Sequence, residues 1–146
     1  MEPFLERDTI IRKASDLLKQ KPHVLFAYLF GSYAAGRPHR SSDIDIAVYL
    51  RPDLDKMERF RLRLLLSDLL SDLFGIKVDL IDLAAAPLSL QHCILKQKVL
   101  FLERDKGSRI SFEVASRREY FDLQRVLERR SDALIDKVSA DGATYG

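Results

Sequence analysis

The chain has 146 residues, of which 47% are hydrophobic and 32% are charged, and its formal net charge is +2. This is the composition of one ordinary globular domain, and it excludes disorder. So small a net charge does not favour direct nucleic-acid binding. A single cysteine excludes an internal disulfide, and the segment MEPFLERDTI lacks the apolar core of a signal peptide. We therefore expect one cytoplasmic domain over residues 1–146.

The first predicted elements are a helix and two strands. Apolar residues at helical spacing from Phe4 to Lys21 predict an amphipathic helix that ends before Pro22. The run from His23 to Phe30 is almost wholly apolar, which predicts a strand covered on both faces. After a turn-rich segment, apolar residues alternate with two aspartates from Asp43 to Leu50. This alternation predicts a strand with one apolar and one acidic face.

The next predicted element is a helix that begins at a capping box, Asp55 with Glu58, and is closed by Gly75. Its expected buried side consists of Phe60, Leu64, Leu65, Leu69 and Leu73. The leucine-rich part of this helix carries charges and is too short to cross a bilayer, so we expect no membrane anchor.

Three elements complete the prediction. Ile76 to Leu83 alternates as a strand, Pro87 opens a short helix through Lys96, and Val99 to Leu102 forms a last strand. From Ser108 to Val138 the chain is highly charged with recurring apolar residues, which predicts a long C-terminal helix, unbroken or broken once. The expected fold class is α/β (α+β), a mixed β-sheet with helices packed on it. Its core spans about residues 8–102, and a helical extension spans about 108–138.

Gly31 and Ser32 are the first candidate site residues. They directly follow the buried strand, and the next residues resemble the first turn of a short helix. The unpaired N–H groups of a helix start attract an anion, and glycine allows the anion to approach the backbone closely. A Gly-Ser pair alone is also common in an ordinary turn capped by serine. The neighbouring residues must therefore distinguish a phosphate-binding turn from an ordinary one.

Asp43 and Asp45 are candidate metal ligands. Their spacing on a strand places both carboxylates on one face, where they repel each other unless a cation neutralises them. Hard oxygen ligands suit Mg²⁺, which takes one or two carboxylates and completes its shell with water and phosphate oxygens. Solvated aspartates at a strand start are the plainer alternative. A pair of metals requires a further bridging carboxylate.

Asp79 is the expected third carboxylate, and Asp82 is its rival. Asp79 lies in the middle of the strand between apolar neighbours, where an unpartnered carboxylate is costly to bury. The two aspartates face opposite sides of a regular strand, and we expect Asp82, near the strand end, to be the more easily solvated.

The segment GSYAAGRPHRSSDIDIAV resembles the signature of the DNA polymerase β nucleotidyltransferase superfamily: Gly-Ser, ten residues, then Asp-x-Asp. Gly36 and Ser42 also resemble the common form, and VDLIDL stands where the third acidic strand is expected. The resemblance covers about residues 8–102 and implies a polymerase-β-like fold. It further implies catalytic and metal-binding roles for Asp43, Asp45 and Asp79, nucleotide binding at Gly31 and Ser32, ATP as substrate and two Mg²⁺. Ala35 stands where many relatives place a basic residue, which leaves the roles of Arg37 and Arg40 open.

The short length resembles the minimal nucleotidyltransferases (MNT proteins), antitoxins that are paired with HEPN ribonuclease toxins. This resemblance implies transfer of AMP from ATP to a tyrosine of the toxin. Two alternatives stay open: a small-molecule nucleotidyltransferase of the aminoglycoside type, and a catalytically silent toxin-binding module. Self-association also stays open.

Other polar residues have plainer explanations. We expect His92 and Cys93 to be packing residues and His39 to be a solvated loop residue. The basic pairs Arg117-Arg118 and Arg129-Arg130 are typical of a solvated helix face, although a partner could also bind there.

Overall fold

The computed structural model describes residues 5–145. It confirms the predicted fold class, a mixed four-stranded sheet with helices packed on it and a long C-terminal helix. The elements are α1 (Arg7–Lys19), β1 (Val24–Phe30), α2 (Gly31–Ala34), β2 (Ile44–Leu50), α3 (Lys56–Phe74), β3 (Val78–Asp82), a short 3-10 turn (Leu83–Ala85), α4 (Leu88–Gln97), β4 (Val99–Glu103) and α5 (Lys106–Tyr145).

The sheet has the strand order β3-β2-β1-β4. β1 pairs antiparallel with β2 and with β4, whereas β2 and β3 are parallel. Parallel strands need a crossover connection, and α3 provides it. In consequence β2 and β3 begin at the same edge of the sheet, and β1 ends there.

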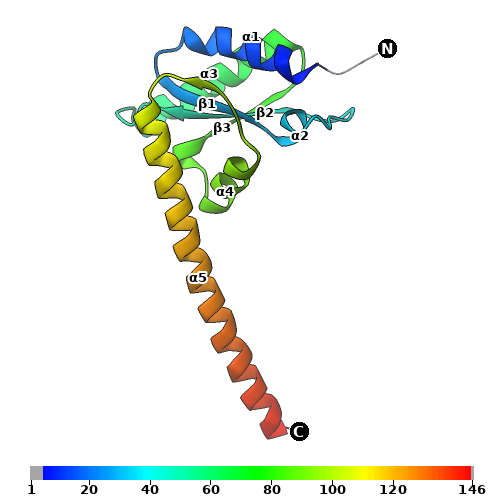
Figure 1. Cartoon of the computed structure of the whole chain (residues 1–146), viewed down its shortest axis with the longest axis vertical. Helices are drawn as coiled ribbons and strands as arrows, with labels where there is room; N and C mark the ends of the chain where they lie inside the picture. Colours follow the sequence, from blue (N-terminus) through cyan, green and yellow to red (C-terminus); the bar gives the residue numbers. More distant parts are fainter. Residues whose placement is uncertain (1–4, 146) are drawn as a thin grey trace.

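The two faces of the sheet are covered by different helices, as Figure 1 shows: α1 and α3 lie on one side, α4 and the first turns of α5 on the other. As predicted, successive residues of β2 face opposite sides of the sheet. Ile44, Ile46 and Val48 pack in the cluster under α1 and α3, whereas Ala47 packs in the cluster under α4. Asp45 therefore belongs to the α4 side of the sheet.

The capping box of α3 is confirmed, but its expected buried side is wrong. Asp55 accepts from the backbone of Glu58, and Gly75 closes the helix in the left-handed conformation. The buried residues are Leu66 and Leu70, while Phe60, Leu64, Leu65 and Leu73 are exposed and Leu69 is half-buried. Hydrogen bonds fix the rotation of the helix, because the Ser67 and Ser71 hydroxyls bind the carbonyl and N–H of Val78.

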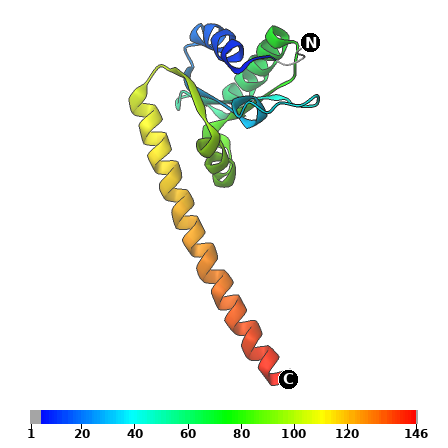
Figure 2. The ribbon, with the colours of Figure 1, turned by 45° about the vertical axis from the view of Figure 1, so that its right-hand side comes forward.

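Helix α5 is one unbroken helix that projects away from the sheet (Figures 1 and 2). The apolar residues that predicted it, Ile110, Val114, Phe121, Leu127, Leu134 and Val138, are all exposed. Among the side chains described for α5, the buried polar ones are Glu113 and Ser116. Contact with the rest of the chain therefore combines these polar groups with the half-buried Phe112, which packs against Phe26 and Tyr49.

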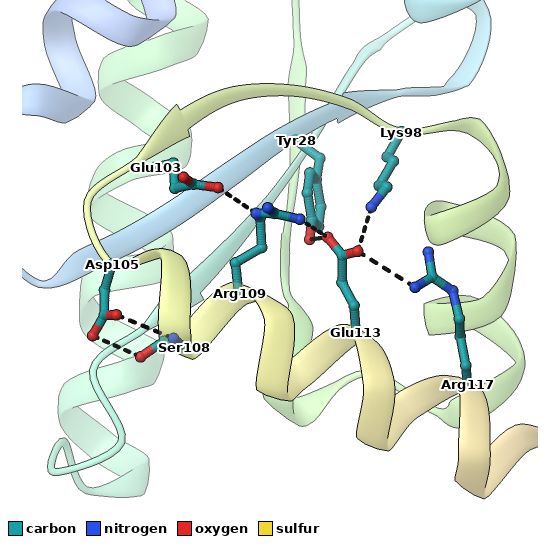
Figure 3. A network of polar contacts seen from close by, with 8 residues as sticks. All are labelled: Tyr28, Lys98, Glu103, Asp105, Ser108, Arg109, Glu113 and Arg117. Carbon is teal, nitrogen blue, oxygen red and sulfur yellow. Dashed lines mark hydrogen bonds and ion pairs between the residues drawn. The ribbon is translucent and has the colours of Figure 1, made fainter.

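Glu113 is the centre of that contact (Figure 3). Tyr28 donates its hydroxyl to Glu113 Oε2 at 2.6 Å, and Lys98 Nζ lies 2.6 Å from Oε1. Arg109 and Arg117 complete the set from the neighbouring turns of α5. Burial raises the pKa of Glu113, but these donors outweigh it and lower the pKa to about 2. The carboxylate thus joins α5 to β1 and to the start of β4.

Smaller differences from the sequence predictions concern ends and exposure. Helix α1 begins at Arg7, and Phe4 lies outside the described residues. The expectation that Cys93 is a packing residue is wrong, because Cys93 is exposed; His92 is half-buried and stacks on Tyr120. Within the described part of the chain, none of the helices is both long and apolar enough to cross a lipid bilayer.

Candidate active site

The predicted site residues gather at the edge of the sheet where β1 ends and β2 and β3 begin. In the strand register Asp45 is paired with Phe30, the last residue of β1, and with Asp79 of β3. Gly31 follows Phe30 directly, and Asp43 precedes β2. The sheet thus places Asp79 beside Asp45 and both of them near the Gly31-Ser32 turn.

Gly31 is required by the close approach of Asp45. Its φ is +75°, a conformation that residues with a side chain rarely adopt. A Cβ at this position would overlap Asp45 Oδ2 and lie 2.9 Å from Asp45 Cγ. The absence of a side chain therefore allows the carboxylate to lie directly against the backbone at the start of α2. Ser32 follows there and is half-buried.

Two contacts that the sequence did not predict hold α2. Arg7 of α1 donates to the Ala34 carbonyl at 2.9 Å, and the N–H of Gly31 donates to Gln97 Oε1 at 3.3 Å. Gln97 is the last residue of α4, so α4 is connected to the proposed nucleotide site. No local sequence pattern marks such contacts, because the Gly31–Gln97 pair is separated by 66 positions along the chain.

The carboxylates make this edge electrostatically unfavourable. Burial raises the pKa of Asp45, and the charges of Asp79 and Asp43 raise it further, to about 6. The nearest cationic group to Asp43 among its ion-pair contacts is Lys77, with Nζ 3.9 Å from Oδ2. That lysine is largely exposed, so it offsets little of the repulsion. A bound cation would relieve it.

The expected exposure of the two aspartates of β3 is wrong, although their opposite orientation is confirmed. Asp79 is exposed, whereas Asp82 is only 8% exposed. The buried carboxylate of Asp82 is neutralised by Arg59, whose guanidinium contacts both of its oxygens, at 3.0 and 2.7 Å. Asp82 therefore joins α3 to β3, and Asp79 is left free to face Asp45.

The donor set at this edge fits a hard divalent cation in kind, because Asp43, Asp45 and Asp79 offer only carboxylate oxygens. In residues 5–145, however, no three His, Cys, Asp or Glu side chains are grouped closely enough to hold a metal ion. The chemistry of the donors thus supports a magnesium site, and the ligand role of each aspartate stays a proposal.

The basic residues of the loop before β2 are exposed. His39 is solvated as expected, and its ring contacts the Ser41 hydroxyl at 3.1 Å. Arg37 and Arg40 are also exposed, and nothing in their contacts assigns either of them to a phosphate.

Comparison with known proteins agrees with this geometry. The family described as polymerase beta, nucleotidyltransferase, matches residues 12–107. Protein adenylyltransferase MntA of Shewanella oneidensis is 32% identical over 140 residues, which cover 95% of this chain and 91% of MntA.

Two solved structures extend the comparison. A chain of a toxin–antitoxin crystal structure with AMP-PNP is similar with a TM-score of 0.67 and 34% identity, over 92% of this chain and 98% of that one. A second similar chain comes from the structure of a complex between tri-AMPylated Shewanella oneidensis HEPN toxin and MNT antitoxin. Its TM-score is 0.65 and its identity is 30%, over 90% of this chain and 98% of that one. Together with the family match, these similarities lead to one conclusion: the chain belongs to the polymerase beta nucleotidyltransferase family.

Proposed function

We propose that this chain is a protein adenylyltransferase and an antitoxin, which transfers AMP from ATP to a tyrosine hydroxyl of a cognate HEPN ribonuclease toxin. The observation that carries the proposal is the register that places Asp45 against Gly31 and beside Asp79. This register supports the proposal because it brings the Gly31-Ser32 turn and the aspartates to the same edge of the sheet. The similarity over nearly the whole length of MntA supports the protein acceptor.

In the proposed reaction the acceptor oxygen attacks the α-phosphorus, the bond to the β-phosphate oxygen breaks, and pyrophosphate leaves. The Gly31 and Ser32 backbone binds the triphosphate, which orients the α-phosphorus for in-line attack. Asp79 accepts the proton of the acceptor hydroxyl, since its carboxylate is solvent-accessible and next to Asp45. Positioning and charge stabilisation supply most of the acceleration in phosphoryl transfer.

Asp43, Asp45 and Asp79 would hold Mg²⁺, and two ions are part of this proposal. When bound, the metal neutralises the triphosphate and lowers the pKa of the acceptor hydroxyl. The exposed arginines Arg37 and Arg40 lie in the loop beside the site, and we assign neither of them a role.

The test offers α-labelled ATP and Mg²⁺ to three mixtures: the chain with the cognate HEPN protein, the chain with an aminoglycoside, and the chain alone. We expect label on the HEPN protein only. Label on the aminoglycoside would favour the small-molecule transferase. Stable binding to the HEPN protein without label in any mixture would favour the silent toxin-binding module.

A further inference from the structure

The outer surface of α3 carries apolar residues that no other part of the described chain covers. Met57 is 57% exposed, Leu64 is 45% exposed and Leu65 is 51% exposed. Three charged residues on the same side of the helix are exposed as well. We define the outer face of α3 by these six residues: Met57, Arg61, Leu64, Leu65, Asp68 and Asp72.

The charges on the outer face are segregated along the helix. Arg61 lies before the two central leucines, and Asp68 and Asp72 lie after them. The ion pairs found within the described residues engage other groups and leave these three side chains to solvent. An exposed apolar surface between charges of opposite sign is typical of an interface.

The spacing of these residues is symmetric about the midpoint between Leu64 and Leu65. Arg61 lies three positions before Leu64, and Asp68 lies three positions after Leu65. In two antiparallel helices, residues equally far from the crossing point on either side lie opposite each other. An antiparallel copy would thus place Leu64 against Leu65 of the other copy, and Arg61 against its Asp68 on both sides.

We propose that the outer face of α3 pairs antiparallel with the same face of a second copy of this chain, forming a two-fold symmetric dimer. Such an interface is isologous, so each contact occurs twice. The leucines form its centre, and the ion pairs lie close enough to the crossing point to form at either common helix-packing angle.

A neighbouring hollow extends the apolar surface beyond α3. It has a volume of about 300 Å³ and is bordered by Leu54, Leu62 and His23 beside Arg61 and Leu65. An interface made of one helix pair and this neighbouring hollow would bury less than about 1,200 Å² in total, which is the small end of the range for specific interfaces. The dimer should therefore dissociate on dilution.

The dimer would leave both candidate active sites accessible. The α3 helix covers one face of the sheet, and Asp45 belongs to the opposite face, with α4 (Figure 1). Helix α5 also extends away from that opposite face (Figure 2). Two acceptor proteins could bind to one dimer at the same time.

The test uses charge reversal and sedimentation equilibrium of the purified full chain over a range of concentrations. We expect the wild type to dimerise as concentration rises and Arg61→Asp and Asp68→Arg each to stay monomeric, since each places like charges opposite one another. An equimolar mixture of the two variants should dimerise again, because the two carboxylates of the first variant then face the two guanidinium groups of the second. A mere loss of folding could not produce this rescue.

Two controls complete the experiment. Arg130→Asp makes the same charge change at an exposed position of α5 and should dimerise like the wild type. Leu64→Asp should stay monomeric while its circular dichroism equals that of the wild type. The proposal is overturned if the wild type stays monomeric at the highest concentration, if the mixture stays monomeric, or if the single variants dimerise normally. If the wild type is monomeric at every concentration and the Arg61→Asp and Asp68→Arg variants no longer bind the HEPN protein, the outer face of α3 is a binding surface for the toxin instead.

Discussion

At the scale of single residues, the surroundings of Asp45 disfavour the charge of its own carboxylate. Its carboxylate is partly buried beside Asp79 and Asp43, and the burial and these neighbours raise its pKa to about 6. Asp82, three residues beyond Asp79, shows the opposite arrangement, because Arg59 neutralises it at short distance. The two residues should therefore respond in opposite ways to the same substitution.

Asp45→Asn should abolish AMP transfer and stabilise the metal-free protein. Removing the repelled charge should raise the free energy of unfolding by about 1 kcal/mol. The effect is no larger because solvent screens the half-exposed carboxylate. The melting temperature should rise by about 3 °C. Calorimetry in EDTA and a transfer assay test both effects.

Asp82→Asn is the matched control for this substitution. It leaves the Arg59 guanidinium without its charged partner, which should lower the free energy of unfolding by about 3 kcal/mol. Transfer should persist below the melting temperature. If Asp82→Asn lost transfer while Asp45→Asn kept it, the assignment of the two carboxylates would have to be exchanged.

Gly31→Ala should reduce transfer by about 100-fold, since the new methyl group would displace the Asp45 carboxylate by about an ångström or more. Gly75→Ala is the comparison: Gly75 has a similar φ of +65°, but open space surrounds its Cβ position. Both should lose about 1 kcal/mol of stability from backbone strain. Steady-state kinetics should separate them, and equal loss of transfer in both would argue against the clash.

At the scale of elements, the attachment of α5 depends on a buried carboxylate. Glu113 is 5% exposed and accepts from Tyr28, Lys98 and Arg109. Burial, together with the hydrogen bond to Glu113, raises the pKa of Tyr28 well above its usual range, so the hydroxyl stays a donor. A carboxylate bound in this way stabilises the helix contact only while it is ionised.

Stability should therefore fall in acid because of Glu113. Its pKa is about 2 in the folded chain and about 4.5 when the chain is unfolded, so the unfolded state binds the proton first. The contribution is complete above pH 4.5 and is lost as the pH falls from there towards 2. In Glu113→Gln this part of the pH dependence should be absent, which urea unfolding at several pH values can measure; an unchanged slope would contradict the network.

Sequence periodicity predicted the buried face of an element well where apolar residues occupy only one of its faces, and poorly where they occur on all sides. Residues 44–50 alternate along the strand, so the side of Asp45 could be assigned correctly. In α3, leucine recurs around the whole helix, and hydrogen bonds from Ser67 and Ser71 decide which leucines are buried. The attachment of α5 includes the hydrogen bond between Tyr28 and Glu113, groups far apart in the chain, for which periodicity gives no signal.

At the scale of the whole molecule, the sheet separates two surfaces. The candidate active site lies on the face with α4, and the proposed dimer surface lies outside α3 on the other. The order of the elements and the Gly-Ser and Asp-x-Asp motifs were sufficient to predict the fold and the neighbouring positions of Asp45 and Asp79 in the sheet. The contact between Gly31 and Gln97 could not be predicted, because it arises only when α4 packs beside α2.

This separation predicts that dimerisation and catalysis are independent. Arg61→Asp should be monomeric and yet transfer AMP at the rate of the wild type, because Arg61 lies on the opposite side of the sheet from Asp45. Initial rates at a concentration where the wild type is dimeric provide the measurement. A rate that falls with the dimer fraction would mean that one copy contributes to the site of the other.

The central claim is the transfer of AMP to a HEPN toxin, and peptide mass spectrometry of the toxin tests it most directly. The toxin is incubated with ATP, Mg²⁺ and either the wild-type chain or Asp45→Asn, and its ribonuclease activity is measured in parallel. We predict AMP on a toxin tyrosine and loss of ribonuclease activity with the wild type, and neither with the variant. An unmodified toxin that the wild type and the variant inhibit equally would contradict the account.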